Sequence, residues 1–396
     1  MARKRADYYY DENRRIKRER PKGAGRALVL WVMDGEMYVV SLASAIALLG
    51  GMLAKVVDPQ TTAVFAFVGL FYHIIYLVNI ACALWWVVRW NRWFWLSALV
   101  LLVGSVNVGL FYRSDVKQKS EEVVRTREDL TITTYNVMNF NDEGCKEGES
   151  NFERVAEWLA KEGGQIVCLQ EAHFSSSRSY GDFKDRLAKF GYGFFTNTDH
   201  KNADGKTGSG YAVFSTYPIV RHRVADADSL GVNGVWADVK IGRDTLRVFN
   251  LHLQSTGITN EEQVGTLSHR IIDDSLASTK LAKVAEKMVD NYRARAVEVR
   301  NVAALVESSP YPVVVCGDFN DTPVSYTYGT LRSAGLDDAF VKKGRGTEYT
   351  FKGLYNLFRI DYILPQEERF EVKSYASYDL DYSDHKPIVV TLQRVE

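Results

Sequence analysis

Residues 313–321 read VVVCGDFND, in which four apolar residues lead into a segment with a glycine, two aspartates and an asparagine. A short apolar run bounded by glycine and polar residues is typical of a buried β-strand. Asp318 and Asn320 come just past its end, and both are costly to bury yet suited to a metal ion or a phosphate group. The stretch therefore predicts a core strand that carries polar groups to one edge of a sheet.

Other apolar runs carry the same kinds of residue at or just past an end. They are Asn136 in TYNVMNF, Glu171 in IVCLQEA, His252 in FNLHLQS, Asp361 in FRIDYIL, and Asp384 with His385 in YSDHKPIVV. Each alone has an ordinary explanation, since an Asp after a strand is usually a turn former and a single His is usually a satisfied core or surface residue. Six coincidences in one domain instead predict a site of carboxylates, amides and imidazoles.

The runs around these residues indicate a strand-rich α/β domain. Apolar or alternating segments predict strands at 130–137, 165–169, 211–215, 235–241, 245–253, 312–316, 359–364, 370–375 and 387–392. Helical periodicity appears at 151–162, 182–190 and 274–308. About 270 residues suffice for one large domain, which we place at 129–396 after a linker at 113–128.

Composition excludes several classes of protein. Of 396 residues, 46% are hydrophobic and 25% charged, with 49 basic against 49 acidic residues, which rules out a disordered chain or a collagen-like repeat. The four cysteines have neither CxxC spacing nor a nearby histidine at zinc-finger distance, so we expect no disulfide framework and no zinc site. Cys168 and Cys316 lie in aliphatic runs and are expected to be core thiols.

The charges are segregated along the chain. Residues 27–112 hold only three basic and three acidic residues and contain uncharged runs at 37–54, 61–88 and 93–112. At about 1.5 Å per helical residue, these runs approach or exceed the ~30 Å of a bilayer core, so they predict three transmembrane helices in a lipid bilayer. The alternatives are helices buried in a soluble core, whose polar stripe is missing here, and a cleavable signal peptide for the first run.

Basic residues predict the orientation of these helices. Residues 1–26 hold ten Lys and Arg, and the turn between the second and third runs adds Arg89 and Arg92. Because basic loops favour the cytoplasm, the tail and this turn are expected on the cytoplasmic side of the membrane, with everything after residue 112 outside the cytoplasm. A basic tail that binds nucleic acid is the alternative explanation.

At this point the sequence resembles the endonuclease/exonuclease/phosphatase superfamily, which includes deoxyribonuclease I, exonuclease III and sphingomyelinases. The resemblance runs over 129–394 in the family's motif order, and GDFND, IDYIL and SDH are its most specific motifs. With three helices ahead of the domain, the chain looks like a membrane-anchored bacterial branch. The resemblance implies four layers, two mixed β-sheets flanked by helices, and a metal-dependent hydrolase of phosphoric ester bonds.

The resemblance also implies a role for each site residue. Glu171 would be the principal ligand of Mg²⁺, or of Mn²⁺ as an alternative, with Asn136 and Asp384 beside it. Asp318 would position or deprotonate water, Asn320 would donate to the phosphate, and His252 would be a phosphate ligand or a proton donor. His385 would contact the phosphate with Asp361 on its other ring nitrogen. Whether Asp318 or His385 is the base stays open.

Two features bear on the expected number of metal ions and on the expected substrate: one departure from the family pattern, and the net charge of the domain. Met138 stands where some members have an acid, so single-metal chemistry is expected. Residues 113–396 hold 36 basic and 42 acidic residues, which weakens a nucleic-acid substrate. Phospholipid or head-group phosphoesters are the expected substrates, an extracytoplasmic nuclease is the alternative, and a non-catalytic binding domain is a further one. No feature of the sequence indicates a protein partner.

Overall fold

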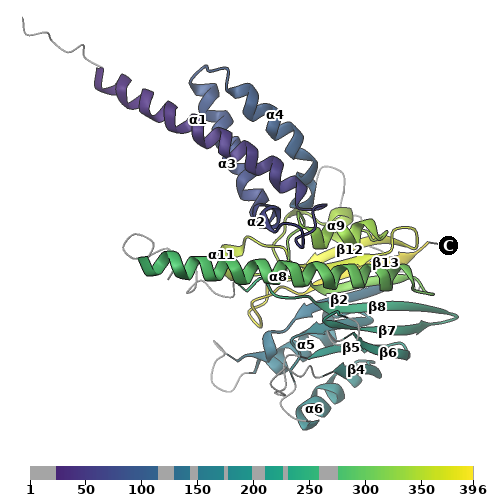
Figure 1. The fold of residues 1–396 in the computed structure, drawn as a ribbon. Coiled ribbons are helices and arrows are strands. Elements are labelled where there is room, and N and C mark those ends of the chain that lie inside the picture. Colours follow the sequence, from purple (N-terminus) through teal and green to yellow (C-terminus); the bar gives the residue numbers. More distant parts are fainter. Residues whose placement is uncertain are drawn as a thin grey trace, which may run out of the picture.

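The computed structural model describes residues 24–114, 129–142, 150–173, 177–198, 210–225, 231–257 and 275–395 (Figure 1). Most of the predicted basic tail, nearly all of the predicted linker and Cys145 lie outside these residues. The predicted strands are all present within a few residues of their expected ends. The helices predicted at 151–162 and 274–308 are also present, whereas the helix expected at 182–190 begins earlier, at Ser177.

Two mixed β-sheets form the centre of the domain. The six-stranded sheet has the order β12-β13-β2-β3-β5-β4, and the five-stranded sheet has the order β11-β9-β8-β7-β6. Their bounds are β2 Leu130–Asn136, β3 Ile166–Gln170, β4 Phe194–Thr198, β5 Tyr211–Ser215, β6 Ile219–Ala225, β7 Gly234–Ile241, β8 Asp244–His252, β9 Val313–Asp318, β11 Asp361–Pro365, β12 Phe370–Ser377 and β13 Ile388–Arg394. The pairs β2–β3 and β8–β9 are parallel, and the other pairs are antiparallel.

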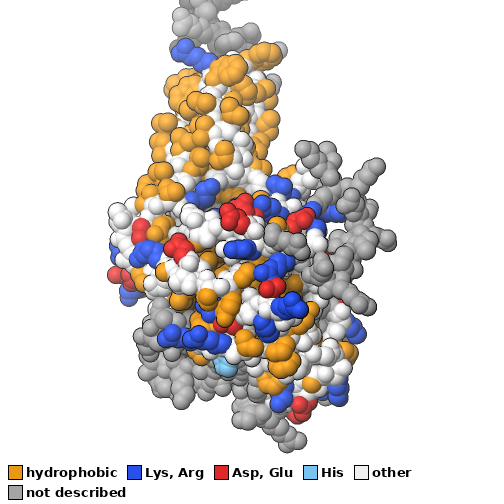
Figure 2. All heavy atoms as spheres, turned by 90° about the vertical axis from the view of Figure 1, so that its right-hand side faces the viewer, with side chains coloured by type: hydrophobic (Ala, Val, Ile, Leu, Met, Phe, Trp, Pro, Cys, Tyr) orange, Lys and Arg blue, Asp and Glu red, His pale blue; other side chains and the backbone are white. Residues whose placement is uncertain are grey.

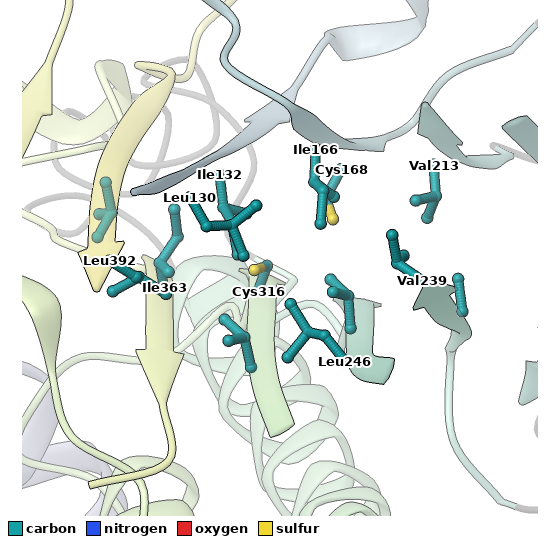
Figure 3. Close-up of a cluster of buried hydrophobic side chains, with 14 of the residues drawn as sticks. Leu130, Ile132, Ile166, Cys168, Val213, Val239, Leu246, Cys316, Ile363 and Leu392 are labelled. Atoms are coloured by element: carbon teal, nitrogen blue, oxygen red, sulfur yellow. The ribbon is translucent and has the colours of Figure 1, made fainter. Parts of the chain in front are cut away.

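The two sheets pack face to face through side chains that alternate along each strand. Ile166 and Cys168 of β3 face Cys316 of β9 across the interior, where Cys168 and Cys316 are buried free thiols (Figure 3). Residues one position along point outward, so Val167 and Val315 pack against helices instead. Because both faces of these strands are covered, the runs are continuously apolar in sequence, which confirms the predicted core thiols.

Helices cover the outer faces and complete four layers. The helices α5 (Asn151–Glu162) and α6 (Ser177–Ala188) pack on the six-stranded sheet. The long α8 (Ser275–Glu307) and α9 (Tyr326–Ser333) pack on the five-stranded sheet. Shorter elements are α10 (Ala339–Lys343), α11 (Gly353–Asn356), the 3-10 turn η3 (Met138–Phe140) and a two-stranded pair of β1 (Tyr112–Arg113) with β10 (Gly346–Thr347).

Ahead of the domain, helices form a bundle that projects from it (Figure 1). They are α1 (Ala24–Leu53), α2 (Val64–Leu70), α3 (Tyr72–Val88), α4 (Phe94–Gly104) and the 3-10 helix η1 (Ser105–Leu110). Polar contacts join α1 to α3: the amide nitrogen of Asn79 donates to the Ser44 carbonyl at 3.1 Å, and Arg89 pairs with Asp34 at 2.7 Å. The turn after α3 therefore lies at the same end of the bundle as the first part of α1.

The prediction of three membrane helices is wrong in that form. Among the described residues, one helix is long and apolar enough to cross a membrane, Val29–Leu53, or two if a bent pair counts as one span. The expected helix at 61–88 breaks at Phe71 into α2 and α3, which meet at a 70° bend, and the third run gives only the shorter apolar segment Phe94–Leu110. The broken helix results from the packing of α2 along the catalytic domain.

Several contacts join the bundle to the catalytic domain. The hydroxyl of Thr322 donates to the Gly69 carbonyl at 3.4 Å, and Gln60 donates to the Arg293 carbonyl at 2.8 Å. The ring centroids of Phe71 and Phe358 lie 6.1 Å apart. Figure 2 shows hydrophobic side chains over the projecting bundle and a mixture of charges on the domain below it. Exposed apolar residues on the bundle include Trp31, Val39, Ile46, Leu77, Leu84 and Val88.

Candidate active site

The predicted site residues meet at one edge of the two sheets. His252 at the end of β8 lies opposite Asp318 at the end of β9, and Asp361 at the start of β11 lies opposite Asp318 on its other side. In the other sheet, Asn136 ends β2, while Glu171 directly follows β3. Ends of parallel strands meet at one edge, and antiparallel neighbours begin there, so the topology gathers residues that are far apart in sequence.

A glycine allows β9 to reach this edge. Gly317 has a φ of +136°, and a Cβ atom there would lie 1.9 Å from the carbonyl oxygen of Leu251. No other residue fits such a close approach of two strands. Gly317 of the GDFND motif therefore brings Asp318 level with His252.

Two carboxylates lie side by side in the site. The amide nitrogen of Asn136 donates to Glu171 Oε1 at 3.0 Å and to Asp318 Oδ2 at 3.1 Å. His252 Nε2 lies 3.7 Å and 3.6 Å from the same two oxygens. Asp318 is almost fully buried, whereas the Glu171 side chain is 23% exposed. The pair concentrates negative charge between an amide and an imidazole, with one member open to solvent.

A buried imidazole and carboxylate form the second part of the site. His385 Nδ1 lies 2.9 Å from Asp361 Oδ2, and His385 Nε2 lies 3.7 Å from Asp318 Oδ2. Burial by itself lowers the pKa of His385, but the carboxylates of Asp361 and Asp318 outweigh it and raise this pKa to about 10. The ring is therefore an imidazolium at neutral pH, with Nε2 directed towards Asp318.

Asp318 and Asn320 are held in place by the backbone around them. Asp318 Oδ1 accepts the backbone N–H of Asn320 at 2.8 Å, and the Asn320 side chain donates to the Leu253 carbonyl at 3.1 Å. Asp384 follows Ser383, whose hydroxyl lies 3.3 Å from Asp384 Oδ1. The structure thus brings all eight predicted site residues together, six of them around one pocket, with Asn136 and Asp361 directly behind it.

Supporting residues that the sequence did not single out hold this arrangement. The Ser383 hydroxyl donates to the Asn136 carbonyl at 2.7 Å and accepts from the His385 backbone at 3.1 Å. Thr350 Oγ1 accepts the backbone N–H of Asp361 at 3.0 Å. Ser383 belongs to the SDH motif and was open to prediction, whereas no local signal marks Thr350.

Helix α8 supports the loop after β8. Arg295, fully buried, donates to the Gln254 carbonyl at 2.7 Å and to Thr256 Oγ1 at 2.8 Å. Glu298 accepts the backbone N–H of Gln254 at 2.7 Å, and Thr256 in turn donates to the Asn320 carbonyl at 2.8 Å. Two charged residues of the long helix thus fix the loop that holds Asn320.

Backbone strain concentrates at the same place. Among the described residues, nine other than glycine have a positive φ, and only Trp90 lies away from the site and its pocket. The others are Met138, Asn139, Phe140, Glu171, Asn320, Leu354, Tyr355 and Asn356. Such conformations cost about 1–3 kcal/mol each and persist where the surroundings impose them, as at ligand sites.

A pocket of about 540 Å³ opens over these residues. Its polar floor is made by Glu171, His252, Asp318, Asn320, Asp384 and His385. Its walls are mostly apolar and come from two distant parts of the chain, the break between α2 and α3 and the segment from Phe351 to Ile360. A pocket of this size suits a small ligand with both polar and apolar parts.

The arrangement of strand-end acids, amides and imidazoles matches a known family. The model of the Endonuclease/Exonuclease/phosphatase family matches residues 133–385. The chain belongs to this family. Members of the endonuclease/exonuclease/phosphatase family hydrolyse phosphoester bonds, so the chain is a hydrolase of that class. Enzymes of the family generally depend on a divalent metal ion.

Similar solved structures include three proteins of the endonuclease/exonuclease/phosphatase family. The protein from Beutenbergia cavernae DSM 12333 is 18% identical, with a TM-score of 0.48 over 68% of this chain and 72% of that one. The protein from Leptotrichia buccalis C-1013-b is 15% identical, with a TM-score of 0.46 over 67% of this chain and 99% of that one. The protein from Bacteroides thetaiotaomicron is 20% identical, with a TM-score of 0.46 over 67% of this chain and 97% of that one.

Two further comparisons concern the rest of the chain. A second family model, described as a domain of unknown function, matches residues 34–111, which form the helical bundle. No curated protein matches the sequence.

The donor set of this family member fits a hard divalent cation. Glu171 presents a partly exposed carboxylate to the pocket, and Asp384 lines the same pocket. Asn136 directs its nitrogen to the two carboxylates and its Oδ1 to the backbone N–H of Met138 at 3.1 Å, so its oxygen reaches a cation only after the amide rotates. Asp318, Asp361 and His385 also have ligand atoms within 4.8 Å of one another, and all three residues are buried, Asp318 and His385 at the pocket floor and Asp361 behind it.

Proposed function

We propose that this hydrolase uses Mg²⁺, held by Glu171 with Asn136 and Asp384, to cleave a phosphoester bond in the pocket. The observation that carries the proposal is the pocket floor, where the open carboxylate of Glu171 and the imidazolium of His385 lie on either side of Asp318. When bound, the metal supplies positive charge that polarises a phosphate oxygen. Oxygen ligands with few carboxylates suit Mg²⁺, which keeps several of its waters, and Mn²⁺ is the alternative.

Glu171 is a better candidate for the metal than the buried group of Asp318, Asp361 and His385. In that group, Asp361 Oδ2 already pairs with His385 Nδ1 at 2.9 Å, and a cation would have to displace an imidazolium. Among the described residues, the Glu171 carboxylate accepts hydrogen bonds from the side-chain amides of Asn136 and Asn139, and it faces the pocket. Because no second acid follows Asn136, we propose a single metal ion.

The remaining residues would handle the phosphate and the proton. His385 holds its proton, so its Nε2–H is suited to a phosphate oxygen, with Asp361 fixing the ring. Because His385 already carries its proton, Asp318, whose Oδ2 lies between the two imidazoles, is left as the proton acceptor for the attacking water. Asn320 would donate to the phosphate after leaving the Leu253 carbonyl, and His252 would protonate or bind the leaving oxygen.

We also propose that α1 anchors the enzyme in a membrane. Only 22% of its most apolar window is buried, which differs from a core helix of a soluble protein, and its hydrogen bonds to α3 make it part of the fold. The basic tail and the Arg89–Arg92 turn would face the cytoplasm, and the catalytic domain at 129–396, after the linker at 113–128, would lie in the periplasm beside the inner membrane.

The hydrolase proposal is tested with the full chain in detergent and two soluble probes, bis(4-nitrophenyl) phosphate and 4-nitrophenyl phosphate. We expect hydrolysis of at least one probe that EDTA abolishes and Mg²⁺ restores. Glu171→Gln should lower the rate by at least about a hundredfold and raise the Mg²⁺ concentration needed, because the amide keeps the shape without the charge. Glu368→Gln, an exposed change away from the pocket, is the matched control. Activity that is unaffected by EDTA would refute the metal assignment.

The orientation is tested by reporter fusions. A reporter active only outside the cytoplasm should be active when fused after Glu396 and silent when fused at Arg89. The opposite pattern would overturn the proposed orientation.

A further inference from the structure

The pocket wall contributed by the N-terminal helices is the feature that points to the substrate. Leu70 and Phe71, at the break between α2 and α3, line the same pocket as the predicted catalytic residues. They are held there by contacts with the catalytic domain, since Phe71 packs on Phe358 and the Gly69 carbonyl accepts from Thr322. The broken helix is thus a part of the active site, although it lies far from every motif in sequence.

The facing wall is a strained and partly exposed loop. Leu354, Tyr355 and Asn356 have φ values of 52°, 63° and 58°, in the left-handed region that residues other than glycine rarely adopt. Leu354, Tyr355 and Leu357 nevertheless line the pocket, and Tyr355 is 74% exposed. A backbone held in this conformation to display apolar side chains at the mouth of a polar site indicates binding of an apolar group.

The apolar wall is continuous with the surface of the bundle. Phe71 is 40% exposed at the base of α3, and Val78, on the same face of the helix, is 37% exposed. Leu77 and Leu84, beside that face, are 61% exposed each. Figure 2 shows the apolar surface reaching down the bundle to the domain. A hydrocarbon chain leaving the bilayer along this surface would meet Phe71 and Leu354 directly beside the phosphate-binding residues.

We propose that the cleft between the α2–α3 break and the loop at 353–357 binds a hydrocarbon chain of a membrane lipid, so that the enzyme hydrolyses lipid phosphoesters at the bilayer surface. This inference rests on the proposed function, because it names the substrate class of the same site. The polar floor holds only the phosphate region, and the walls bind the chain next to it. The aromatic residues of the walls could also stack on nucleobases, so DNA and RNA are included in the test.

The test compares lipids with their deacylated counterparts, using the full chain reconstituted in vesicles. The probes are dioleoylphosphatidate against glycerol 3-phosphate for a monoester, and dioleoylphosphatidylglycerol against glycerophosphoglycerol for a diester. We expect kcat/KM for the lipid of at least one pair to exceed that of its counterpart by about a hundredfold, as several buried methylene groups allow.

Variants of the loop assign the preference to the cleft. Leu354→Ser and, separately, Leu357→Ser should each lower the ratio of lipid to deacylated rate by about tenfold, because part of the apolar contact is lost. The second variant guards against misfolding of the first. Val220→Ser, at an equally apolar and 59% exposed position on β6, is the matched control and should leave the ratio unchanged.

The outcomes separate this inference from the proposed function. Equal rates on lipid and deacylated probes, or an unchanged ratio in both loop variants, would overturn the inference while leaving the hydrolase in place. Cleavage of DNA or RNA without cleavage of either lipid would do the same and would identify a nuclease. Absence of hydrolysis of every probe in the presence of Mg²⁺ would refute the proposed function, and the inference with it.

Discussion

Replacing Asp361 with asparagine changes the charge state of His385 without removing the ring. Asp361 Oδ2 and His385 Nδ1 are 2.9 Å apart, and both residues are buried. Asparagine can still accept a hydrogen bond from Nδ1–H through its side-chain oxygen, so the contact survives in neutral form. What disappears is the nearest negative charge that raises the pKa of His385 to about 10.

The size of the effect follows from that pKa. Without Asp361, the pKa of His385 falls back towards the ordinary histidine value of about 6.5, because burial, which lowers it, opposes the remaining effect of Asp318, which raises it. At pH 7.5 a group with a pKa of about 6.5 is protonated in only about a tenth of molecules, so kcat should fall at least about tenfold. At pH 6.5 about half of the rings are protonated, so the variant should recover about fivefold, whereas the parent enzyme should show no such gain.

The assay is kcat against pH with saturating Mg²⁺ and a soluble phosphoester, together with a thermal melt. Loss of one charge-assisted bond should cost about 1–2 kcal/mol, which corresponds to a melting temperature lower by less than about 8 °C. Asp290→Asn, at a side chain that is 72% exposed on α8, is the control. The double variant with His385→Ala should be hardly slower than His385→Ala alone, because the two residues act as one unit.

Two results would refute this reasoning. A rate loss in Asp361→Asn that does not change between pH 6.5 and 7.5 would show that the protonation of His385 is not what Asp361 provides. A large drop in melting temperature with a normal rate in the folded fraction would make Asp361 a purely structural residue.

Three further predictions concern stability and the supporting residues. The pKa of His385 is higher in the folded than in the unfolded chain, so its protonation stabilises the fold fully below about pH 6.5. As the pH rises to about 10, the free energy of unfolding should fall by roughly 3–5 kcal/mol. Denaturant melts in EDTA should show this slope, and His385→Gln should remove it. Gly69→Val should destabilise the chain by about 1–3 kcal/mol, because a Cβ atom would lie 2.3 Å from the Val324 carbonyl oxygen. Gly35→Val is the control, because a Cβ atom there meets nothing within 4 Å. Equal melting temperatures of the two variants would contradict the docking of α2. Thr256→Val should leave Arg295 and the Asn320 carbonyl without their hydrogen-bond partner and lower the free energy of unfolding by about 1–3 kcal/mol. It should lower kcat more than it raises KM. A change in KM alone would be evidence against a positioning role.

Local patterns were sufficient to predict nine of the eleven strands of the two sheets and the polar residues at their ends, whereas β4 and β6 were missed. The run from Val313 to Cys316 is apolar because both faces of β9 are covered, and covered strands must be apolar at every position. Asp318 and His385 stand out in sequence because charged groups beside apolar runs are costly unless they are paired.

Local patterns also misled where a contact between distant segments decides the structure. The apolar run at 61–88 has the composition of one long helix, and its residues favour no break at Phe71. The chain bends there because Gly69 packs against Val324 with no room for a side chain, and Phe71 packs on Phe358. Helical periodicity reports which residues are apolar and cannot report which surface they will meet.

The sequence by itself therefore determined the strand-rich α/β domain and the polar residues at its strand ends, because these depend on the pattern along each strand. Its resemblance to the family, carried by motifs of a few residues, implied the four layers and the phosphoester chemistry. Only the tertiary structure decided how Arg295 and Thr350 support the site, and that Phe71 and Leu354 wall the pocket. The contacts of Arg295 and Thr350 join distant positions that meet only in the folded domain, and Phe71 reaches the pocket only after the bundle has packed on that domain.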